Sequence, residues 1–185
     1  MDFIPDQPSQ SKDVPYFDNV TSEGGWQGHS TSKSIETLKA EVVAAIGRLG
    51  GIVTGFQQGR FTIGAKTRDG FRVHYAIERP NGVMIPGRMD VAALPVKDDY
   101  RRKRSYDSRR QKSLKMALYM LRQALNGTWF LQQLSPGYSA LMPWMLDQSS
   151  KKTITQLWSD HLTIGNLLPS GDDDILDGEF EELHT

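Results

Sequence analysis

The sequence predicts an α+β domain, with an amphipathic helix, an antiparallel meander of three or four strands, and a long basic helix packed on the sheet. Three changes of pattern predict it. Apolar residues recur every three or four positions over residues 34–49, alternate with polar ones from about residue 52 to 91, and return to helical spacing before residue 126. Short helices after residue 128 and disordered termini complete the prediction; the capping-box spacing of Thr153 and Gln156 introduces one of these helices.

Composition divides the 185 residues into three parts. Residues 1–32 are rich in Pro, Ser and Asp and predict a flexible arm, with Phe17 and Trp26 as local anchors. Residues 33–168 would form a single domain, and residues 169–185 an acidic disordered tail. The N-terminus has no secretory signal pattern and no stretch is long and apolar enough for a membrane span, so we expect a cytoplasmic protein.

The first helix is expected to begin after Ser34, which can cap it, and to stop at Gly50-Gly51. Four β-rich runs follow, at residues 52–56, 60–67, 71–77 and 83–91. The turns between them would be Gln57-Gln58-Gly59, Arg68-Asp69-Gly70 and Pro80-Asn81-Gly82. Asp69-Gly70 is a hairpin signal, and Pro86-Gly87 favours an edge position or a bulge.

Alternation within these runs predicts one apolar face of the sheet and one basic face. Phe61 is expected on the apolar face with Val73 and Tyr75. Arg60, Lys66 and Arg72 are expected on the opposite, solvent-facing side, with Arg88 as a further candidate. A solvated outer face and a cationic surface for a phosphate backbone are both compatible with this pattern.

The long helix is expected to begin between Ser105 and Ser108 and to close at Asn126-Gly127. A flank formed by Lys112, Lys115, Tyr119 and Arg122 adjoins its apolar stripe. The apolar stripe comprises Leu114, Ala117, Leu118, Leu121 and Leu125. Basic residues near the N-terminus, such as Arg109 and Arg110, oppose the helix dipole at ~0.3–1 kcal/mol each, which favours an anionic partner.

The formal net charge of zero conceals a strong asymmetry. Residues 1–33 carry two basic and five acidic groups, residues 34–127 eighteen and eight, and residues 128–185 two and nine. The stretch from Arg101 to Arg122 holds nine Lys/Arg and a single acid, Asp107. A basic middle between acidic ends favours nucleic acid as the partner.

We therefore predict sequence-independent nucleic-acid binding, with single-stranded DNA or RNA favoured. Tyr100, Tyr106 and Tyr119 are the aromatic residues available for base stacking. The predicted binding residues are Arg60, Lys66, Arg72, Arg101, Arg102, Lys103, Arg104, Arg109, Arg110, Lys112, Lys115, Tyr119 and Arg122.

The order of helix, β-meander and basic helix over residues 34–127 resembles the β-β-β-α core of single-strand annealing proteins from phages and eukaryotes. Arg109-Arg110-Gln111-Lys112, followed by Leu118, Leu121, Arg122 and Leu125, carries the resemblance. In those proteins a helix rich in Lys/Arg and Ala/Leu lines a groove for single-stranded DNA. The resemblance implies an annealing or accessory factor of a repair, phage or mobile-element system.

Two alternatives remain open. The first is a protein–protein adaptor or an oligomeric subunit of a larger nucleoprotein complex. Bulky residues over Trp129–Leu146 would form a homo-oligomer, and the acidic tail at 172–183 would bind a protein or compete with nucleic acid. The second is a small metal-dependent nuclease, for which the acids are Glu78, Asp90, Asp98 and Asp99, with Lys97 nearby.

Recognisable catalytic motifs do not occur in the sequence. The chain lacks nucleotide-binding glycine loops, a serine nucleophile elbow and the zinc-protease motif, and its four His residues are scattered. The absence of cysteine excludes disulfides, a thiol nucleophile and a zinc site built on Cys. We expect a non-enzymatic protein with no cofactor and no bound metal.

Overall fold

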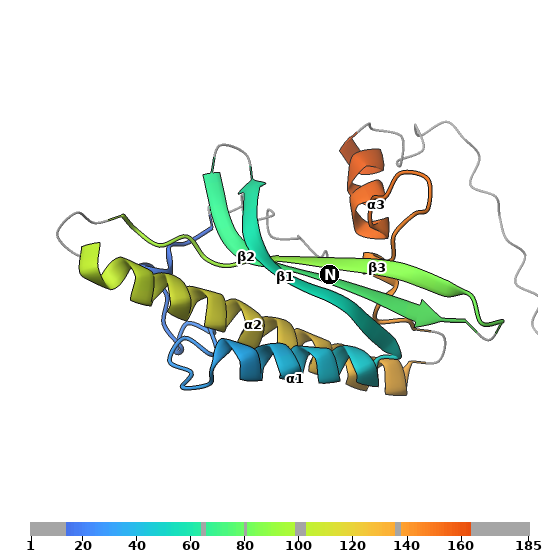
Figure 1. Cartoon of the computed structure of the whole chain (residues 1–185), viewed down its shortest axis with the longest axis horizontal. Helices are drawn as coiled ribbons and strands as arrows, with labels where there is room; N and C mark the ends of the chain where they lie inside the picture. Colours follow the sequence, from blue (N-terminus) through green and yellow to red (C-terminus); the bar gives the residue numbers. More distant parts are fainter. Residues whose placement is uncertain (1–13, 64–65, 80, 99–102, 136–137, 164–185) are drawn as a thin grey trace, which may run out of the picture.

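The computed structural model describes residues 14–63, 66–79, 81–98, 103–135 and 138–163 (Figure 1). A three-stranded antiparallel sheet with helices confirms the α+β prediction. The main elements are α1 (Ile35–Arg48), β1 (Gly51–Ile63), β2 (Lys66–Glu78), β3 (Met84–Ala92), α2 (Lys103–Leu134) and α3 (Ile154–Thr163). Short 3-10 turns η1 (Phe17–Asn19) and η3 (Met142–Trp144) complete them.

The fold has two main layers, the sheet and a pair of helices. α1 and α2 run side by side beneath one face of the sheet, and α3 lies on the other side, near β3 (Figure 1). The core between the layers is built from Leu38, Val42 and Ile46 of α1, Phe71, Val73 and Tyr75 of β2, Met89 of β3, and Leu114, Leu118 and Leu125 of α2. Burial of each large side chain contributes roughly 1.5–3 kcal/mol.

Side-chain caps define where two of the helices begin. The Ser34 hydroxyl accepts a hydrogen bond of 3.0 Å from the Thr37 N–H at the start of α1. At α3, Thr153 and Gln156 each bond the other's backbone N–H, at 3.2 and 3.0 Å, which confirms the capping box indicated by their spacing.

The turns predicted at Gln57-Gln58-Gly59 and at Arg68-Asp69-Gly70 are wrong, because both segments lie inside long strands. β1 is continuous from Gly51 to Ile63, and its residues pair with β2 throughout, Gly59 with Gly70 and Arg60 with Asp69. The two strands are joined at residues 64–65, outside the described residues. Pairing along the whole hairpin has overridden the local Asp-Gly signal.

The true register also corrects the predicted faces of β1. Since Ile63 pairs with Lys66, Arg60 lies opposite Asp69 and Phe61 lies opposite Arg68. Directly paired residues share a face, so Arg60 is on the helix-facing side and Phe61 on the outer side, the reverse of the prediction. The position of a hairpin turn fixes the register, and a slip of one residue exchanges the two faces.

The prediction that the long helix closes at Asn126-Gly127 is wrong, because α2 continues to Leu134. Leu125 is buried in the core, and Asn126 accepts a hydrogen bond from Arg48 of α1. A glycine inside a helix costs about 1 kcal/mol relative to alanine, which this packing outweighs. Although α2 is 32 residues long, none of the helices in the described ranges is apolar enough to cross a membrane.

The N-terminal segment packs onto the domain over residues 14–33. Phe17 and Val20 are buried against Leu94 and Met116. The Phe17 N–H donates to the Pro95 carbonyl at 2.8 Å, and the Phe17 ring stacks on His29. This part of the predicted arm is thus attached, whereas residues 1–13 and the acidic tail at 169–185 lie outside the described residues.

Gly87 provides a test of the packing between β3 and β2. A Cβ at Gly87 would lie 2.2 Å from the Tyr75 ring, whose hydroxyl donates to the Leu141 carbonyl at 2.9 Å. We expect Gly87→Ala to destabilise the protein by roughly 1–3 kcal/mol in urea unfolding. Gly59→Ala is the matched control, since a Cβ there meets nothing within 4 Å. Equal unfolding midpoints for the two variants would contradict this packing.

Candidate nucleic-acid interface

On α2, three of the arginines that were predicted to bind nucleic acid make ion pairs with acids of the domain. They tie α2 to the N-terminal segment, to the sheet and to α1. The pairs are Arg109 with Asp18, Arg110 with Asp69, and Arg122 with Glu41. All three pairs are partly buried, and the Arg110 pair is bidentate. Pairs of this kind hold elements in place, so these arginines already have a structural role.

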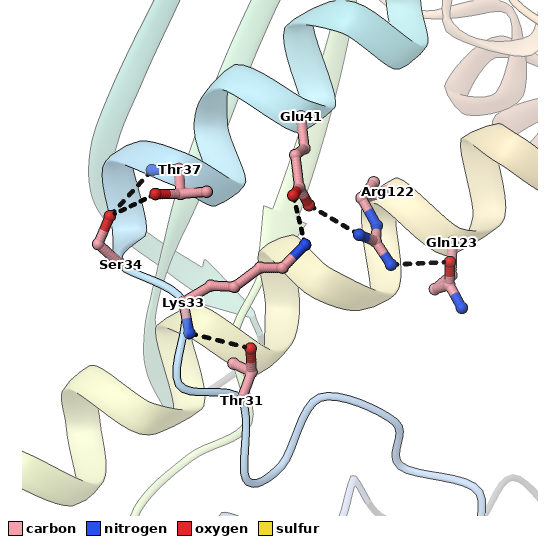
Figure 2. Close-up of polar contacts among 7 residues, drawn as sticks. All are labelled: Thr31, Lys33, Ser34, Thr37, Glu41, Arg122 and Gln123. Atoms are coloured by element: carbon pink, nitrogen blue, oxygen red, sulfur yellow. Dashed lines mark hydrogen bonds and ion pairs between the residues drawn. The ribbon is translucent and has the colours of Figure 1, made fainter.

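Among the described residues, three carboxylates each contact two cations. The first is Glu41 of α1, which accepts a hydrogen bond from Lys33 and one of 2.7 Å from Arg122. Lys33 comes from the loop before α1 and Arg122 from α2, and both point at the same carboxylate (Figure 2). Arg122 also donates to the Gln123 side chain at 3.1 Å.

The second shared carboxylate is Asp69 of β2. Arg110 of α2 binds it through two nitrogens, and the Nη2–Oδ1 distance is 2.6 Å. Arg60 of β1 approaches from the other strand of the hairpin, with its Nε 3.5 Å from Oδ1. Asp69 therefore joins the hairpin to the helix beneath it.

The third is Asp90 of β3, on the outer face of the sheet. Arg72 of β2 binds both of its oxygens, at 2.7 and 2.9 Å. The Arg88 Nε lies 3.3 Å from Asp90 Oδ2, and another Arg88 nitrogen donates to Gln156 of α3. Arg72 also lies over the Phe61 ring, 5.8 Å from its centroid.

In each group one cation is more buried than the other. We call the more exposed set the outer cations; they are Lys33, Arg60 and Arg72, with side chains 38%, 68% and 40% exposed. Their inner counterparts, Arg122, Arg110 and Arg88, are 17%, 29% and 18% exposed. One carboxylate between two cations leaves each group with one net positive charge, and the outer cation presents that charge to solvent.

Lys112 and Lys115 add to the accessible positive charge on the described part of α2. Both lie on the predicted basic flank, and neither forms an ion pair with the acids in the described part of the chain. Tyr119, on the same flank, has the Arg122 guanidinium 4.5 Å from its ring centroid. Tyr119 and residues Gly28 and 30–33 line a polar pocket of about 330 Å³.

The remaining predicted residues lie at the ends of elements or outside the description. Lys66 pairs with Ile63 at the tip of the hairpin, and Lys103 and Arg104 occupy the first turn of α2. Arg101, Arg102 and Tyr100 are outside the described residues. Sequence reasoning missed Lys33, because it stands alone before a helix cap and belongs to no periodic pattern.

The nuclease candidates within the described residues are not gathered at one site, and Asp99 lies outside those residues. Asp90 is held between two arginines near the end of β3, whereas Glu78 ends β2. Lys97 donates to Asn19, and Asp98 follows it in the chain. Across the described residues there is no group of three or more His, Asp or Glu side chains that could hold a metal ion.

Two of the shared carboxylates, Asp69 and Glu41, have a lowered pKa and so favour the ionised form. Hydrogen bonds from Arg110 lower the pKa of Asp69, and the hydrogen bond from Lys33 lowers the pKa of Glu41, in both cases against the opposing effect of burial. A carboxyl group with a lowered folded-state pKa stabilises the fold above its unfolded value, and this contribution is lost as the pH falls through the folded pKa.

Comparison with protein-family models, curated proteins and solved structures finds no match to this chain. The geometry of the charged groups is therefore the basis for any functional assignment.

Acid unfolding tests the shared carboxylates. The ordinary pKa values are 3.8 for Asp69 and 4.5 for Glu41, so we expect the free energy of unfolding to hold above about pH 5 and to fall below about pH 4. Asp69→Asn should lower stability at pH 7 and flatten the fall, as measured by urea unfolding from pH 3 to 7. Glu23→Gln, at an exposed acid, should leave the profile unchanged. An Asp69→Asn profile parallel to that of the unaltered protein would contradict the role of Asp69.

Proposed function

We propose that the protein binds nucleic acid without sequence preference and that single strands are its favoured ligand. One observation carries the proposal: each of the three shared carboxylates holds two cations and leaves the outer one exposed. With Lys112 and Lys115 this gives five accessible positive charges among the described residues, distributed over the helix side and the outer face of the sheet. Phosphate oxygens are the plentiful anions that such charges attract.

The shared carboxylates favour binding through preorganisation. An arginine or lysine free in solvent loses side-chain entropy when it contacts a phosphate, by up to about 2 kcal/mol. Arg72 donates hydrogen bonds to Asp90 through its Nε and Nη2 atoms, so its side chain has already lost part of that freedom on folding. A phosphate approaching it therefore meets a cation of fixed position, which lowers the entropic cost of binding.

Aromatic rings beside the cations favour a single strand over a duplex. Phe61 lies beneath Arg72 on the outer face, and Tyr119 lies beside Arg122 on α2. Both rings are half-buried. Unpaired bases can stack on the accessible part of such rings, at ~1–3 kcal/mol per base, whereas duplex bases are already stacked on each other. Contacts to phosphates and to ring faces do not read base edges, so little sequence preference is expected.

Salt dependence tests the proposal directly. With about five phosphates neutralised, the slope of log affinity against log salt should be roughly −3.5 for a single strand. The measurement is fluorescence anisotropy of a labelled oligonucleotide at several salt concentrations, with duplex DNA as competitor. Binding that does not change with salt, or no binding at low salt, would overturn the proposal.

Charge reversal at Lys112 and Lys115 tests the position of the interface. We expect the double variant Lys112→Glu/Lys115→Glu to weaken binding by about tenfold or more and to reduce the magnitude of the slope, because two phosphate contacts are lost. Arg79→Glu/Lys151→Glu is the control, since it makes the same change in net charge at exposed residues elsewhere. Equal losses in the two variants would show that only the overall charge matters.

A second candidate function, an oligomeric subunit, is favoured by an exposed apolar patch after the core-facing part of α2. Its most exposed members are Leu134, at 80%, and Phe130, at 60%. Leu131, Tyr138 and Met142 are also exposed. Apolar side chains gathered at one end of a helix are typical of a contact surface, and a second copy of the chain is the partner we propose.

Mass measurement tests the oligomer. We expect light scattering after gel filtration to give a mass above that of one chain, and Phe130→Lys/Leu134→Lys to reduce it to the monomer value. Val43→Lys, at a 40%-exposed residue of α1, is the matched control and should leave the mass unchanged. A monomer in the unaltered protein, or an oligomer that persists in the double variant, would exclude this patch as the interface.

A further inference from the structure

β3 is an edge strand, and part of its outer edge is open. The strand order is β1-β2-β3. The Ala93 N–H donates to Asp69 of β2 at 2.7 Å, so alternation directs the N–H groups of Arg88 and Asp90 away from β2. The chain covers the start of this edge, where the Leu146 N–H donates to the Pro86 carbonyl at 2.9 Å. At the other end of the edge the Arg68 side chain donates to the Ala92 carbonyl at 3.2 Å, and in the described part of the chain no hydrogen-bond partner occurs for the backbone groups of Arg88 and Asp90 that point away from β2.

An apolar pocket of about 320 Å³ lies next to the open edge. It is bounded by the end of β3, by α2 and by Trp26 of the N-terminal segment. Its principal side chains are Trp26, Val91, Leu94, Met116, Met120 and Leu121. A pocket lined by methionine and tryptophan can accommodate a large apolar side chain. Because the pocket lies beside the edge of β3, a strand added to that edge could direct such a side chain into it.

The other face of the same edge is cationic. Arg72 and Arg88 flank the single carboxylate of Asp90 on the outer face, which leaves one net positive charge there. A strand added to β3 would therefore have an apolar pocket on one side and positive charge on the other. Its ideal sequence alternates apolar and acidic residues with a period of two.

Residues 176–181 of this chain have that alternation. The sequence is Leu-Asp-Gly-Glu-Phe-Glu, so Leu176, Gly178 and Phe180 fall on one face of an extended strand and Asp177, Glu179 and Glu181 on the other. This segment lies outside the described residues. We propose that it adds to the open edge of β3, with Phe180 in the apolar pocket and the acids facing Arg72 and Arg88.

The chain is long enough for this contact. α3 starts beside β3, where the Gln156 side chain bonds Arg88 at 3.0 Å, and it ends at Thr163. Twelve residues separate Thr163 from Leu176 and can span up to about 40 Å when extended. This proposal does not rest on nucleic-acid binding, since the edge, the pocket and the charges alone support it, but the tail and a phosphate would share Arg72.

Amide hydrogen exchange measured by NMR tests the docking in the full-length protein. We expect the Asp90 N–H to exchange about tenfold or more slowly in the unaltered chain than in Phe180→Asp, because the added strand would accept its hydrogen bond. Leu183→Asp is the matched control, since it adds the same charge outside the alternating segment. Equal rates in the unaltered protein and in Phe180→Asp would overturn the proposal.

A second comparison tests the pocket without altering the tail. Ala124 is exposed and lines the pocket, so Ala124→Arg should accelerate Asp90 exchange as Phe180→Asp does. Ala44→Arg, at an exposed alanine of α1, should not. If the Asp90 N–H stays protected when the protein is diluted, docking within one chain is supported. If the protection is lost on dilution, a second copy supplies the strand, and docking within one chain is overturned.

Discussion

The ion pair between Arg110 and Asp69 is the contact on which the arrangement of the sheet and α2 depends. It binds the long helix to a hairpin that extends beyond the main core. Asp69 would otherwise be a polar residue in the helix-facing row of β2, where it could not remain without a partner. The two hydrogen bonds contribute only about 1 kcal/mol when discounted for partial exposure, but they select one position of the hairpin over α2.

Counting basic residues along α2 is a poor guide to its surface charge. Several arginines that an amphipathic projection places in solvent reach acids on α1, on β2 and in the N-terminal segment. The distinction between inner and outer cations follows from these long-range contacts. Arg122 and Lys33 share one carboxylate, yet they come from segments 89 positions apart in the chain. Burial then decides which of the two holds the fold and which remains open to an anion.

The parts of the fold that depend on local physics were predictable from sequence. Ser34 marks the start of α1, the spacing of Thr153 and Gln156 marks the start of α3, and the apolar stripes identify the core. The hairpin turn was not predictable, because Asp69-Gly70 is a stronger local signal than residues 64–65. The pairing that overrides it joins residues from opposite ends of the hairpin. The true end of α2 was hidden for a similar reason, since Asn126 is held by Arg48 of another helix.

The length of α2 gives the molecule a fixed internal distance. The helix is anchored in the core through Leu114, Leu118 and Leu125, and it extends beyond this region at both ends. About 28 Å of helix axis separate Lys115 from Leu134, at 1.5 Å per residue. A ligand bound at Lys115 and a second copy of the chain bound at Leu134 would therefore be separated along the helix. In the proposed pair of chains, the distance between each ligand and the contact between the copies would be set by a rigid helix, without any linker whose length could vary.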